Sequence, residues 1–361
     1  MRVLVVNAGS SSLKLSVLGE RDEVLGSRAL ELEQGRWSAS AVEEVLAGWP
    51  EPEAVGHRVV HGGRVFTEPT RLEGGVVERL RELTPLAPLH QPRALAGIEV
   101  VERVLPGVAG VACFDTAFHT TLPEAAATYA VPEQWRRRWG VVRYGFHGLS
   151  HAYASRRARE WTGGERVVTA HLGAGASLAA VLGGRCVDTT MGFTPLEGLV
   201  MATRSGSVDP GLVLWLHEQA GLAVREISEA LVRRSGLLAL AGTADMREVV
   251  EREGRGEASA VLALGVYVHR LRGAVASMAA SMGGLDTLVF TGGVGEGAAR
   301  VRELVARGLG FVGVGVDEGV NAGVEGEGEV SAAGARVRTL VVRAREDVEI
   351  AGGVRGVLAG G

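Results

Sequence analysis

Lysine occurs once in the sequence, at Lys14, which closes the run NAGSSSLK over residues 7–14. All the other basic residues, 38 in total with this lysine, are arginines, so one ammonium is retained at one small Gly/Ser turn. Asn7, which opens the run, is one of only two asparagines, the other being Asn321. An ammonium is a compact point charge, and the backbone N–H groups and serine hydroxyls of a small turn can bind phosphate oxygens. The run therefore predicts a phosphate-binding turn rather than an ordinary surface hairpin.

Apolar, β-branched runs flank this turn and predict strands over 3–6 and 13–18. The turn lacks the helix-opening Gly-Lys-Ser/Thr of a Walker A loop. It resembles the phosphate hairpin of the actin, Hsp70 and sugar-kinase superfamily, whose fold is a duplicated, ribonuclease H-like α/β domain with a nucleotide cleft between the copies. A second hairpin is then expected, and residues 167–182 (VVTAHLGAGASLAAVL) repeat the plan about 160 residues downstream, near the length of one domain.

The bulk composition is typical of a cytoplasmic enzyme. A formal net charge of −4 and the lack of a basic stripe argue against a nucleic-acid surface. Cys113 and Cys186 have no CxxC partner and are interpreted as reduced thiols. The sequence opens on a strand pattern without a signal peptide, and no apolar run reaches membrane-spanning length. The basic cluster from Arg136 to Arg138 is interpreted as a solvated helix face or an interface.

Strand and helix patterns alternate along the chain, which predicts an α/β fold with covered sheets. We expect an N-terminal actin-like domain over 1–146 and a C-terminal one over 147–345 that carries the adenosine site, with 346–361 packing back onto the first. Residues 313–335, rich in Gly, Glu and Val, are expected to form an exposed connection. Strands are expected near 1–7, 12–18, 24–31, 54–60, 108–114, 166–171, 176–182, 285–291 and 337–343, and helices near 40–48, 76–83, 92–104, 148–161, 210–219, 224–234, 257–282, 297–309 and 346–359.

Six strings taken together closely resemble the acetate kinase family, and the resemblance runs in order from Met1 to Arg345-Glu346-Asp347. It implies reversible phosphoryl transfer between ATP and acetate, giving acetyl phosphate and ADP, with Mg²⁺ (or Mn²⁺), in a homodimer. The strings are VVNAGSSSLK at 5–14, GHRVVHGG at 56–63, FDTAFH at 114–119, YGFHG at 144–148, MGFTPLEG at 191–198 and TRSG at 203–206.

Phosphoryl transfer needs positioning and charge stabilisation more than covalent chemistry, and guanidinium groups suit the spread negative charge of the transferred group. Arg58 and Arg204 match the two active-site arginines of the family. His171 matches the histidine that contacts the transferred phosphoryl group. His147 and His151, spaced i and i+4, could be a metal pair, but nothing supplies further zinc ligands, so structural or substrate-side roles are favoured. The resemblance makes His147 a site histidine.

Asp115 follows the strand expected at 108–114, at the carboxyl edge where ligands bind in α/β sheets. A plain helix cap is the alternative reading of this residue. The resemblance implies that Asp115 works with Glu346 around Mg²⁺ and orients the arginines, with Asn7 beside them. Two carboxylates suffice for Mg²⁺, which keeps several of its waters.

The resemblance also assigns a nucleotide site and a substrate pocket, and a glycine-rich turn after a strand would let the backbone approach the nucleotide closely. The implied nucleotide contacts are Ser10, Ser12, Lys14, Gly173, Gly175, Asp245, Met246, Arg247, Gly292, Gly293, Gly295 and Glu296. The implied substrate pocket is Val60, Leu89, His90, Phe146 and Pro195, of which all except His90 match the small apolar pocket for the acetate methyl group.

Four positions depart from the family pattern. The family's His-Leu-Gly-Asn-Gly has Ala174 in place of asparagine, its Ser-Gly-Asp has Ser207, its Gly-Glu-Asn has Gly297, and its His-Asn-Pro has Gln91. None of these changes removes a charged catalytic group. They bear on nucleotide affinity, donor choice and rate.

Two alternatives to an acetate kinase stay open. A kinase for propionate or another short carboxylic acid is one, because a methylene is worth only about 0.8 kcal/mol of burial and the sequence does not display pocket shape. A nucleotide-binding regulatory protein without turnover is the other, because fold alone would allow it. The joint presence of Asn7, Arg58, Asp115, His171 and Arg204 favours an enzyme.

Overall fold

The computed structural model describes residues 1–9, 12–32, 37–88 and 90–360, which form two compact units. The sequence predicts one boundary near residue 146 and a return near 345. The chain instead passes between the units four times, so that residues 121–145 group with unit 2 and residues 146–153 with unit 1. Unit 1 comprises Met1–Thr120, Phe146–Tyr153 and Arg345–Gly361, and unit 2 comprises Thr121–Gly145 and Ala154–Ala344.

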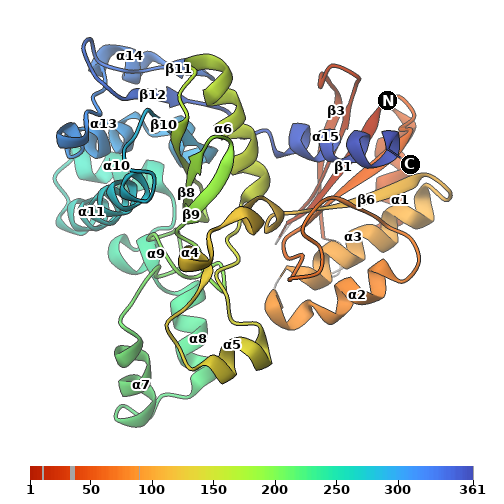
Figure 1. The fold of residues 1–361 in the computed structure, drawn as a ribbon, viewed down its shortest axis with the longest axis horizontal. Helices are drawn as coiled ribbons and strands as arrows, with labels where there is room; N and C mark the ends of the chain where they lie inside the picture. Colours follow the sequence, from red (N-terminus) through yellow and green to blue (C-terminus); the bar gives the residue numbers. More distant parts are fainter. Residues whose placement is uncertain (10–11, 33–36, 89, 361) are drawn as a thin grey trace. The chain divides into compact units, whose positions relative to one another are not determined.

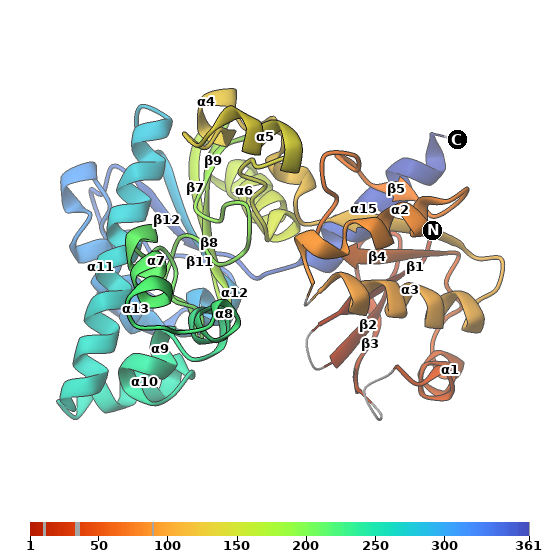
Figure 2. The same cartoon turned by 90° about the horizontal axis from the view of Figure 1, so that it is seen from below.

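Unit 1 is built on a mixed sheet with the strand order β3-β2-β1-β4-β6-β5. Strands β1, β4 and β6 run parallel, and the hairpin strands β2 and β3 continue the sheet antiparallel beside β1. The parallel strands are apolar on both faces because helices cover both, as parallel sheets require. Figure 2 shows α15 on one face and α1 and α3 on the other.

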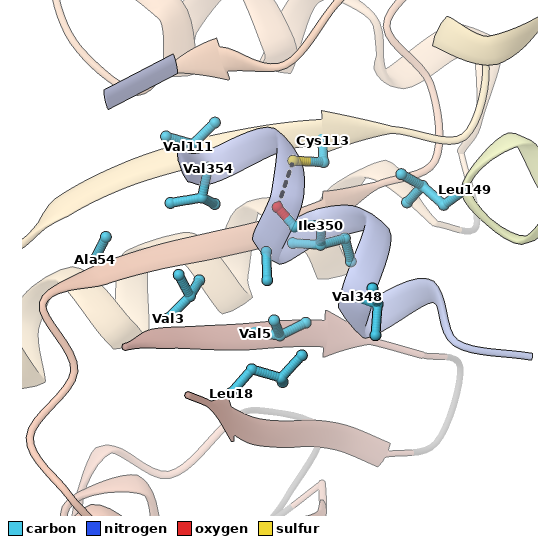
Figure 3. Packing of buried hydrophobic residues seen from close by; sticks show 11 residues of the cluster. Val3, Val5, Leu18, Ala54, Val111, Cys113, Leu149, Val348, Ile350 and Val354 are labelled. Atoms are coloured by element: carbon cyan, nitrogen blue, oxygen red, sulfur yellow. Dashed lines mark hydrogen bonds between the residues drawn. The ribbon is translucent and has the colours of Figure 1, made fainter. Parts of the chain in front are cut away.

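Alternation along these strands divides the core of unit 1 into layers. Val3 and Val5 pack under α15, whereas Leu4 and Val6 pack on the opposite face under α1 and α3. Figure 3 shows the α15 layer, in which the carbonyl oxygen of Ile350 accepts a weak bond from a buried thiol. The C-terminal helix is therefore part of the core of unit 1, packed on β1, β4 and β6.

Unit 2 repeats the same sheet. Its strand order, β11-β12-β10-β7-β8-β9, is that of unit 1 read in the opposite direction, with β7, β10 and β12 parallel and β8 and β9 antiparallel. The long helix α11 packs on β7, β8 and β9, and the part of α6 that belongs to unit 2 lies on the other side of this sheet (Figure 1). The prediction of a duplicated α/β fold is confirmed.

The prediction that 313–335 forms an exposed connection is wrong. It contains the short helix α14 and strand β11, and both Asn321 and Val330 are buried. Polarity misled the prediction, because the backbone of Asn321 and its amide pair with a buried arginine instead of water. The short elements β5, β9, α4, α5, α9, α10 and α12 were also not expected from sequence, since stretches of two to nine residues carry little periodicity. Among the described helices, none combines the length and apolarity needed to cross a membrane.

The strands are β1 (Val3–Ala8), β2 (Ser12–Leu18), β3 (Val24–Glu31), β4 (Ala54–Val59), β5 (Thr70–Arg71), β6 (Ala109–Phe114), β7 (Arg166–Leu172), β8 (Ala176–Leu182), β9 (Arg185–Thr189), β10 (Thr287–Thr291), β11 (Gly328–Glu329) and β12 (Arg338–Val341). The α-helices are α1 (Ala39–Ala47), α2 (Val76–Glu82), α3 (Gln91–Val104), α4 (Glu124–Ala127), α5 (Glu133–Trp139), α6 (Gly148–Thr162), α7 (Pro210–Glu218), α8 (Val224–Arg233), α9 (Gly236–Ala241), α10 (Met246–Gly254), α11 (Ala258–Ser281), α12 (Gly292–Gly297), α13 (Ala299–Arg307), α14 (Glu318–Gly323) and α15 (Glu346–Ala359). Short 3₁₀ helices lie at η1 (Thr84–Leu86), η2 (Ala117–Thr121) and η3 (Gly310–Val312).

The contact between β4 and α15 yields a prediction at Gly56. A Cβ added there would overlap Ile350 Cγ2 and stand 2.8 Å from Val354 Cγ2, so Gly56→Ala should push α15 off the sheet. We expect a loss of about 1–3 kcal/mol in the free energy of unfolding, as for other overpacked cores. Gly352→Ala is the matched control, because its Cβ meets nothing within 4 Å. That substitution should stabilise the helix by about 0.5–1 kcal/mol. Chemical denaturation measures both, and equal effects would contradict the close packing.

Candidate active site

One face of the unit 1 sheet collects polar side chains where its parallel strands end. Alternate residues of a strand point to the same face, and on β1, β4 and β6 the residues packed under α15 are followed two positions later by Asn7, Arg58 and Asp115. Helix α15 begins at Glu346, directly above these positions. Strand alternation and the return of the C-terminal segment thus bring four predicted site residues together.

Arg58 is the centre of this group. Its Nε donates to Asp115 Oδ1 at 3.0 Å and its Nη2 to Asp115 Oδ2 at 2.7 Å, a two-point fork. Its Nη1 donates to Asn7 Oδ1 at 3.3 Å and lies 3.2 Å from Glu346 Oε2. Asn7 Nδ2 donates to the same glutamate oxygen at 3.4 Å. The guanidinium plane is therefore held in one orientation, since bidentate pairs fix geometry as well as charge.

The surroundings keep Arg58 charged. Burial opposes the charge, but the carboxylates of Asp115 and Glu346 outweigh it and raise the pKa of Arg58 above its ordinary value. The second N–H of Nη2 has no acceptor among the residues that the structure describes. This donor is suited to an oxygen of an anionic ligand.

The same group offers the oxygen ligands that a hard divalent cation binds. It offers oxygen atoms from the amide of Asn7 and from the carboxylates of Asp115 and Glu346. With one guanidinium and two carboxylates, it carries an excess of negative charge. The described residues hold no cluster of three or more His, Cys, Asp and Glu side chains placed for a metal, but Mg²⁺ needs only one or two carboxylates plus waters. The residues present therefore fit Mg²⁺.

A tight backbone contact brings the predicted histidine segment to Asp115. The N–H of Gly148 donates to the carbonyl of Asp115 at 2.9 Å, and a Cβ at Gly148 would overlap that oxygen. His147, the preceding residue, has a left-handed backbone with φ of 56°, which few non-glycine residues adopt. His119 Nε2 lies 3.0 Å from the carbonyl oxygen of Phe146. Close packing against Asp115 thus holds His147 in an uncommon conformation.

The predicted pocket residues divide between the units. Val60, half-buried just after β4, His90, which precedes α3, and the fully buried Phe146 belong to unit 1. Pro195 belongs to unit 2, and Leu89 lies outside the described residues. Each unit therefore presents its own part of the predicted set.

The predicted phosphate hairpin has the expected strands, β1 and β2. The N–H of Gly9 donates to the carbonyl of Ser12 at 2.9 Å, and Arg93 Nη1 donates to the carbonyl of Gly9 at 3.4 Å. Lys14 stands opposite Asn7 in the antiparallel register and is exposed. Directly opposed residues share a face of the sheet, so the single lysine lies on the face that carries the Arg58 group. Ser10 lies outside the described residues.

In unit 2 the corresponding edge carries the second predicted turn. His171 pairs in register with Thr291, so the ends of β7 and β10 are neighbours. The N–H of Gly173 donates to the carbonyl of Gly175 at 2.9 Å, which closes the hairpin turn after β7. Gly292 follows β10 with φ of 78°, and a Cβ there would stand 2.8 Å from a β7 carbonyl oxygen. Two glycine-dependent turns therefore lie side by side.

The late glycine turn is a short helix, α12, rather than the open turn expected from sequence. It contains Gly293 and Gly295. Glu296 Oε1 accepts from the N–H of Gly292 at 2.9 Å and from that of Ala344 at 2.9 Å. The carboxylate that the sequence places on the nucleotide thus also holds the turn and the chain just before α15.

A buried arginine supports this turn from behind. Arg302, 2% exposed, donates from Nη1 to the carbonyls of Gly295 at 2.9 Å and Glu296 at 2.7 Å. Its Nε and Nη2 donate to the side chain and backbone oxygens of Asn321 at 2.7 Å and 2.8 Å. The second asparagine of the chain therefore has a structural role, which its rarity signalled but did not identify.

The predicted adenosine motif at the start of α10 has local roles as well. Asp245 caps the helix by accepting from the N–H of Arg247 at 2.9 Å, and it pairs with Arg247 Nη2 at 2.6 Å. Arg247 is 90% exposed, so this pair contributes little to stability. Met246 is buried. The cap explains why an aspartate stands here whether or not a nucleotide is bound.

Arg204 differs from Arg58 in its surroundings. Its Nη1 donates to the carbonyl of Pro195 at 2.6 Å. Burial lowers its pKa below the ordinary value, and no carboxylate among the described residues offsets this. A partly buried guanidinium without a carboxylate partner is suited to binding an anion.

The structure shows the environment of three of the residues that depart from the family pattern. Ser207 Oγ accepts from the N–H of Gly198 at 3.0 Å, which ties together the ends of the loop that contains Arg204. Gln91 is buried, and its Nε2 donates to the carbonyls of His61 at 3.2 Å and Leu80 at 3.1 Å. Ala174 is exposed at the tip of the second hairpin. Gln91 Oε1 is buried and has no hydrogen-bond partner among the described residues.

Sequence reasoning missed several residues that order these loops. Tyr129 and Arg143 bind the carboxylate of Glu197, and Arg302 holds α12. Glu197 lies within the family string at 191–198, but that string does not indicate its partners. Tyr129 and Arg143 carry no local signal, because their contacts with Glu197 cross 68 and 54 positions of the chain, and Arg302 reaches Asn321 across 19 positions.

Comparison with known proteins gives consistent matches. The profile of the Acetokinase family matches residues 40–352. An acetate kinase of Deinococcus deserti is 45% identical over 395 residues, covering 99% of this chain and 98% of that protein.

Solved structures agree. The crystal structure of Porphyromonas gingivalis acetate kinase has a TM-score of 0.91 at 39% identity and covers 99% of both chains. A propionate kinase from Francisella tularensis has a TM-score of 0.92 at 34% identity, covering 98% of this chain and 99% of that one. The ROK hexokinase of Thermus thermophilus, with a TM-score of 0.51 at 15% identity, covers 100% of both chains and shares the fold alone.

Three buried histidines of unit 1 predict acid sensitivity. Burial lowers the pKa of His57 to about 3, and those of His61 and His119 to about 4. As the pH falls below about 6.5, the unfolded chain binds protons that the folded chain does not. The free energy of unfolding should therefore fall as the pH is lowered from about 6.5 to about 4. Above this range the three histidines do not reduce it.

His57→Gln tests this prediction, because Nδ1 of His57 has no hydrogen-bond partner among the described residues. Removing one such group should reduce the slope of unfolding free energy against pH by up to about 1.4 kcal/mol per unit. His269→Gln, at an exposed position of α11, is the control. Urea denaturation across the range is the measurement, and equal slopes for wild type and His57→Gln would contradict the assignment.

Proposed function

Because the chain belongs to the acetokinase family, we propose that it transfers a phosphoryl group reversibly between ATP and acetate, giving acetyl phosphate and ADP. The observation that carries this proposal is the group around Arg58. Asn7, Arg58, Asp115 and Glu346 come from distant parts of the sequence, match the family's motif residues, and lie in one hydrogen-bonded network. An isolated motif match would not require these contacts.

The transfer forms one bond and breaks another. A carboxylate oxygen of acetate bonds to the γ-phosphorus, while the bond from that phosphorus to the oxygen bridging it to the β-phosphate breaks and ADP leaves with the electron pair. Negative charge is spread over the transferred group, so the enzyme acts by positioning and charge stabilisation. Arg58 supplies a permanently charged, fixed fork in unit 1, and Arg204 supplies a guanidinium without a carboxylate partner in unit 2.

Asp115 and Glu346 have distinct roles in this scheme. Asp115 orients Arg58 through both of its oxygens. Asn7 and Glu346, with Asp115 close by, would hold Mg²⁺, which supplies charge neutralisation for the phosphate oxygens when bound. His147 and His171 stand at the ends of ordered segments and are proposed to donate hydrogen bonds to phosphoryl oxygens.

The nucleotide is proposed to bind at the two adjacent turns of unit 2, with Gly173, Gly175, Gly292 and Glu296 nearest to it. Glycines at these positions let backbone N–H groups approach phosphates closely. The hairpin of unit 1, with Ser12 and Lys14, is proposed to contact the phosphates as well, and so is Ser10. The two units are proposed to be the two domains of the family fold.

Two alternatives remain relevant. The likeness to a propionate kinase at 34% identity supports activity on propionate as a second candidate. A non-catalytic regulatory protein is disfavoured, because it would not need an oriented Arg58, a buried Asp115 and a hard-cation donor set together.

We also propose a homodimer in the cytoplasm. Helix α7 is apolar, yet none of its residues is buried, and Leu214 and Trp215 are 59% and 56% exposed. Such a surface on unit 2 is of the kind that a second copy covers. Sedimentation of the purified chain tests this, and a species of monomer mass alone would contradict it. The two buried, free thiols accord with a reducing compartment, which cell fractionation would check.

A substrate panel tests the activity. Purified protein with ATP and Mg²⁺ should form acyl phosphates, trapped as hydroxamates, most efficiently from acetate among formate, acetate, propionate and butyrate. Neighbouring acids should differ by about 10- to 200-fold in kcat/KM, the range that one methylene allows. Propionate ahead of acetate would favour the second candidate, and no product from any acid would favour a regulatory protein.

Arg204→Ala tests the charge-stabilising role. If the guanidinium acts on the transferring group, its loss should fall on kcat more than on the KM for ATP. We expect a drop of at least about 10²-fold, on the order of 3 kcal/mol of barrier. Arg204→Lys should restore only part of the rate, because an ammonium keeps the charge but lacks the planar fork.

Arg137→Ala is the matched control for that experiment. Arg137 is 80% exposed on α5 and, within the described part of the chain, pairs only with Glu133 on the same helix, at 2.6 Å. Its removal should leave kcat within about twofold, as surface pairs contribute little. If folded Arg204→Ala keeps more than about a tenth of the wild-type kcat, the role assigned to it is wrong.

A further inference from the structure

A carboxylate in unit 2 is held by two residues of the segment 121–145. Arg143 Nη2 donates to Glu197 Oε1 at 2.7 Å, and Tyr129 Oη donates to Glu197 Oε2. Arg143 also lies over the ring of Tyr129, 5.3 Å from its centroid. Both oxygens of the glutamate are thus fixed by groups from outside its own loop. Tyr129, Arg143 and Glu197 are called the clamp below.

The clamp also binds the backbone of the loop 190–198. Tyr129 Oη accepts from the N–H of Phe193 at 2.9 Å. Arg143 Nη1 donates to the carbonyls of Thr190 at 3.3 Å and Met191 at 3.1 Å. The tyrosine hydroxyl therefore has a donor and an acceptor partner at once, and the loop is held on both sides of its glycine.

The clamp packs tightly against the backbone of the loop at Gly192. A Cβ added at Gly192 would overlap both Glu197 Oε2 and Tyr129 Oη, and the carbonyl of Gly192 accepts from the N–H of Tyr144 at 3.1 Å. A glycine is required here because the clamp lies directly against the backbone. A shift of the clamp must therefore shift the loop.

The same loop contains Pro195, which contacts one of the two arginines proposed to act on the phosphoryl group. Pro195, two residues after Phe193, is in the set that matches the methyl pocket, and its carbonyl accepts from Arg204 Nη1 at 2.6 Å. A movement of the Phe193–Pro195 segment would change the wall offered to the acid and the orientation of Arg204. No other charged side chain of the described residues binds this segment.

We propose that Tyr129, Arg143 and Glu197 are positioning residues that set the place of the Phe193–Pro195 segment and thereby determine which carboxylic acid is preferred. This inference rests on the proposed carboxylate kinase activity. In this role the clamp acts on the acid through the loop rather than by direct contact. Pocket walls discriminate a methylene by only about 10- to 200-fold, so a small displacement of one wall is enough to change the preference.

The hydroxyl group of Tyr129 keeps its proton near neutral pH. Burial and the hydrogen bond to Glu197 raise the pKa of Tyr129 to about 12. The hydroxyl therefore remains a donor at neutral pH, and its effect on selectivity should not vary with pH there.

Tyr129→Phe is the sharpest test, because it deletes one oxygen and keeps the ring beneath Arg143. We expect the KM for acetate to rise about tenfold, the loss typical of a hydrogen bond to a charged group. The ratio of kcat/KM for acetate to that for propionate should fall at least about threefold, while the KM for ATP stays within about twofold. A merely structural role would alter all parameters together or none.

Tyr267→Phe is the matched control. Its hydroxyl is buried on α11 and has no hydrogen-bond partner among the described residues, so the same deletion should leave both KM values and the acid preference unchanged. Glu197→Gln keeps the side-chain shape and one acceptor oxygen, and should shift the acid preference in the same direction. It carries the test alone if Tyr129→Phe does not fold, as judged by its unfolding midpoint.

The outcomes separate this inference from the activity on which it rests. A wild type that phosphorylates none of the acids overturns the proposed function and this inference with it. An active wild type whose Tyr129→Phe and Glu197→Gln variants keep the acetate-to-propionate ratio overturns this inference alone. A rise in the KM for ATP equal to that for acetate also overturns it, because the clamp would then not act through the acid side.

Discussion

The two-point contact between Arg58 and Asp115 is the interaction on which the site in unit 1 depends. The carboxylate of Asp115 is 1% exposed, so it requires a cation beside it to remain charged. Arg58 meets that need with two N–H groups and keeps Nη1 for Asn7 and Glu346. One guanidinium thereby joins the ends of β1, β4 and β6 to the start of α15. Removing Arg58 would take the two-point partner from the buried carboxylate and would break the contacts that hold Asn7 and Glu346 beside it.

Helix α15 makes the arrangement possible, because it returns the end of the chain to the sheet formed at its beginning. Its apolar residues pack on β1, β4 and β6, and Gly56 lets the helix approach closely enough for Glu346 to reach Arg58. Stability and chemistry are therefore coupled here. The same close packing that buries Ile350 determines where the glutamate lies.

The turn after β10 in unit 2 is ordered by a different means. Arg302 is almost fully buried, yet it donates to carbonyl and amide oxygens rather than to carboxylates. Burial lowers the pKa of Arg204, whereas neighbouring carboxylates raise that of Arg58. The two arginines assigned to the transferred group thus face opposite electrostatic surroundings. Arg58 is oriented and neutralised in advance, while Arg204 retains an unbalanced charge that an anionic substrate would satisfy.

The sequence by itself determined the duplicated fold, most strand positions and the residues around Arg58. Alternation along strands and the single lysine at a Gly/Ser turn indicate the strands and the hairpin, whereas the residues around Arg58 were indicated by the resemblance of long motif strings to the acetate kinase family. The element bounds expected for β1, β2, β7 and β8 differ by no more than two residues from those observed, because their apolar faces are continuous.

Only the tertiary structure decided which polar groups pair. Tyr129 and Glu197 are 68 positions apart, and Arg302 reaches Asn321 across 19 positions. The sequence of 313–335 indicates a solvent-exposed connection, because it is polar and shows little periodicity. In the structure, however, Asn321 of this segment supplies two of the oxygens that accept from Arg302. A buried donor must find an acceptor wherever the fold brings one, and that choice depends on three-dimensional packing rather than on neighbours in sequence.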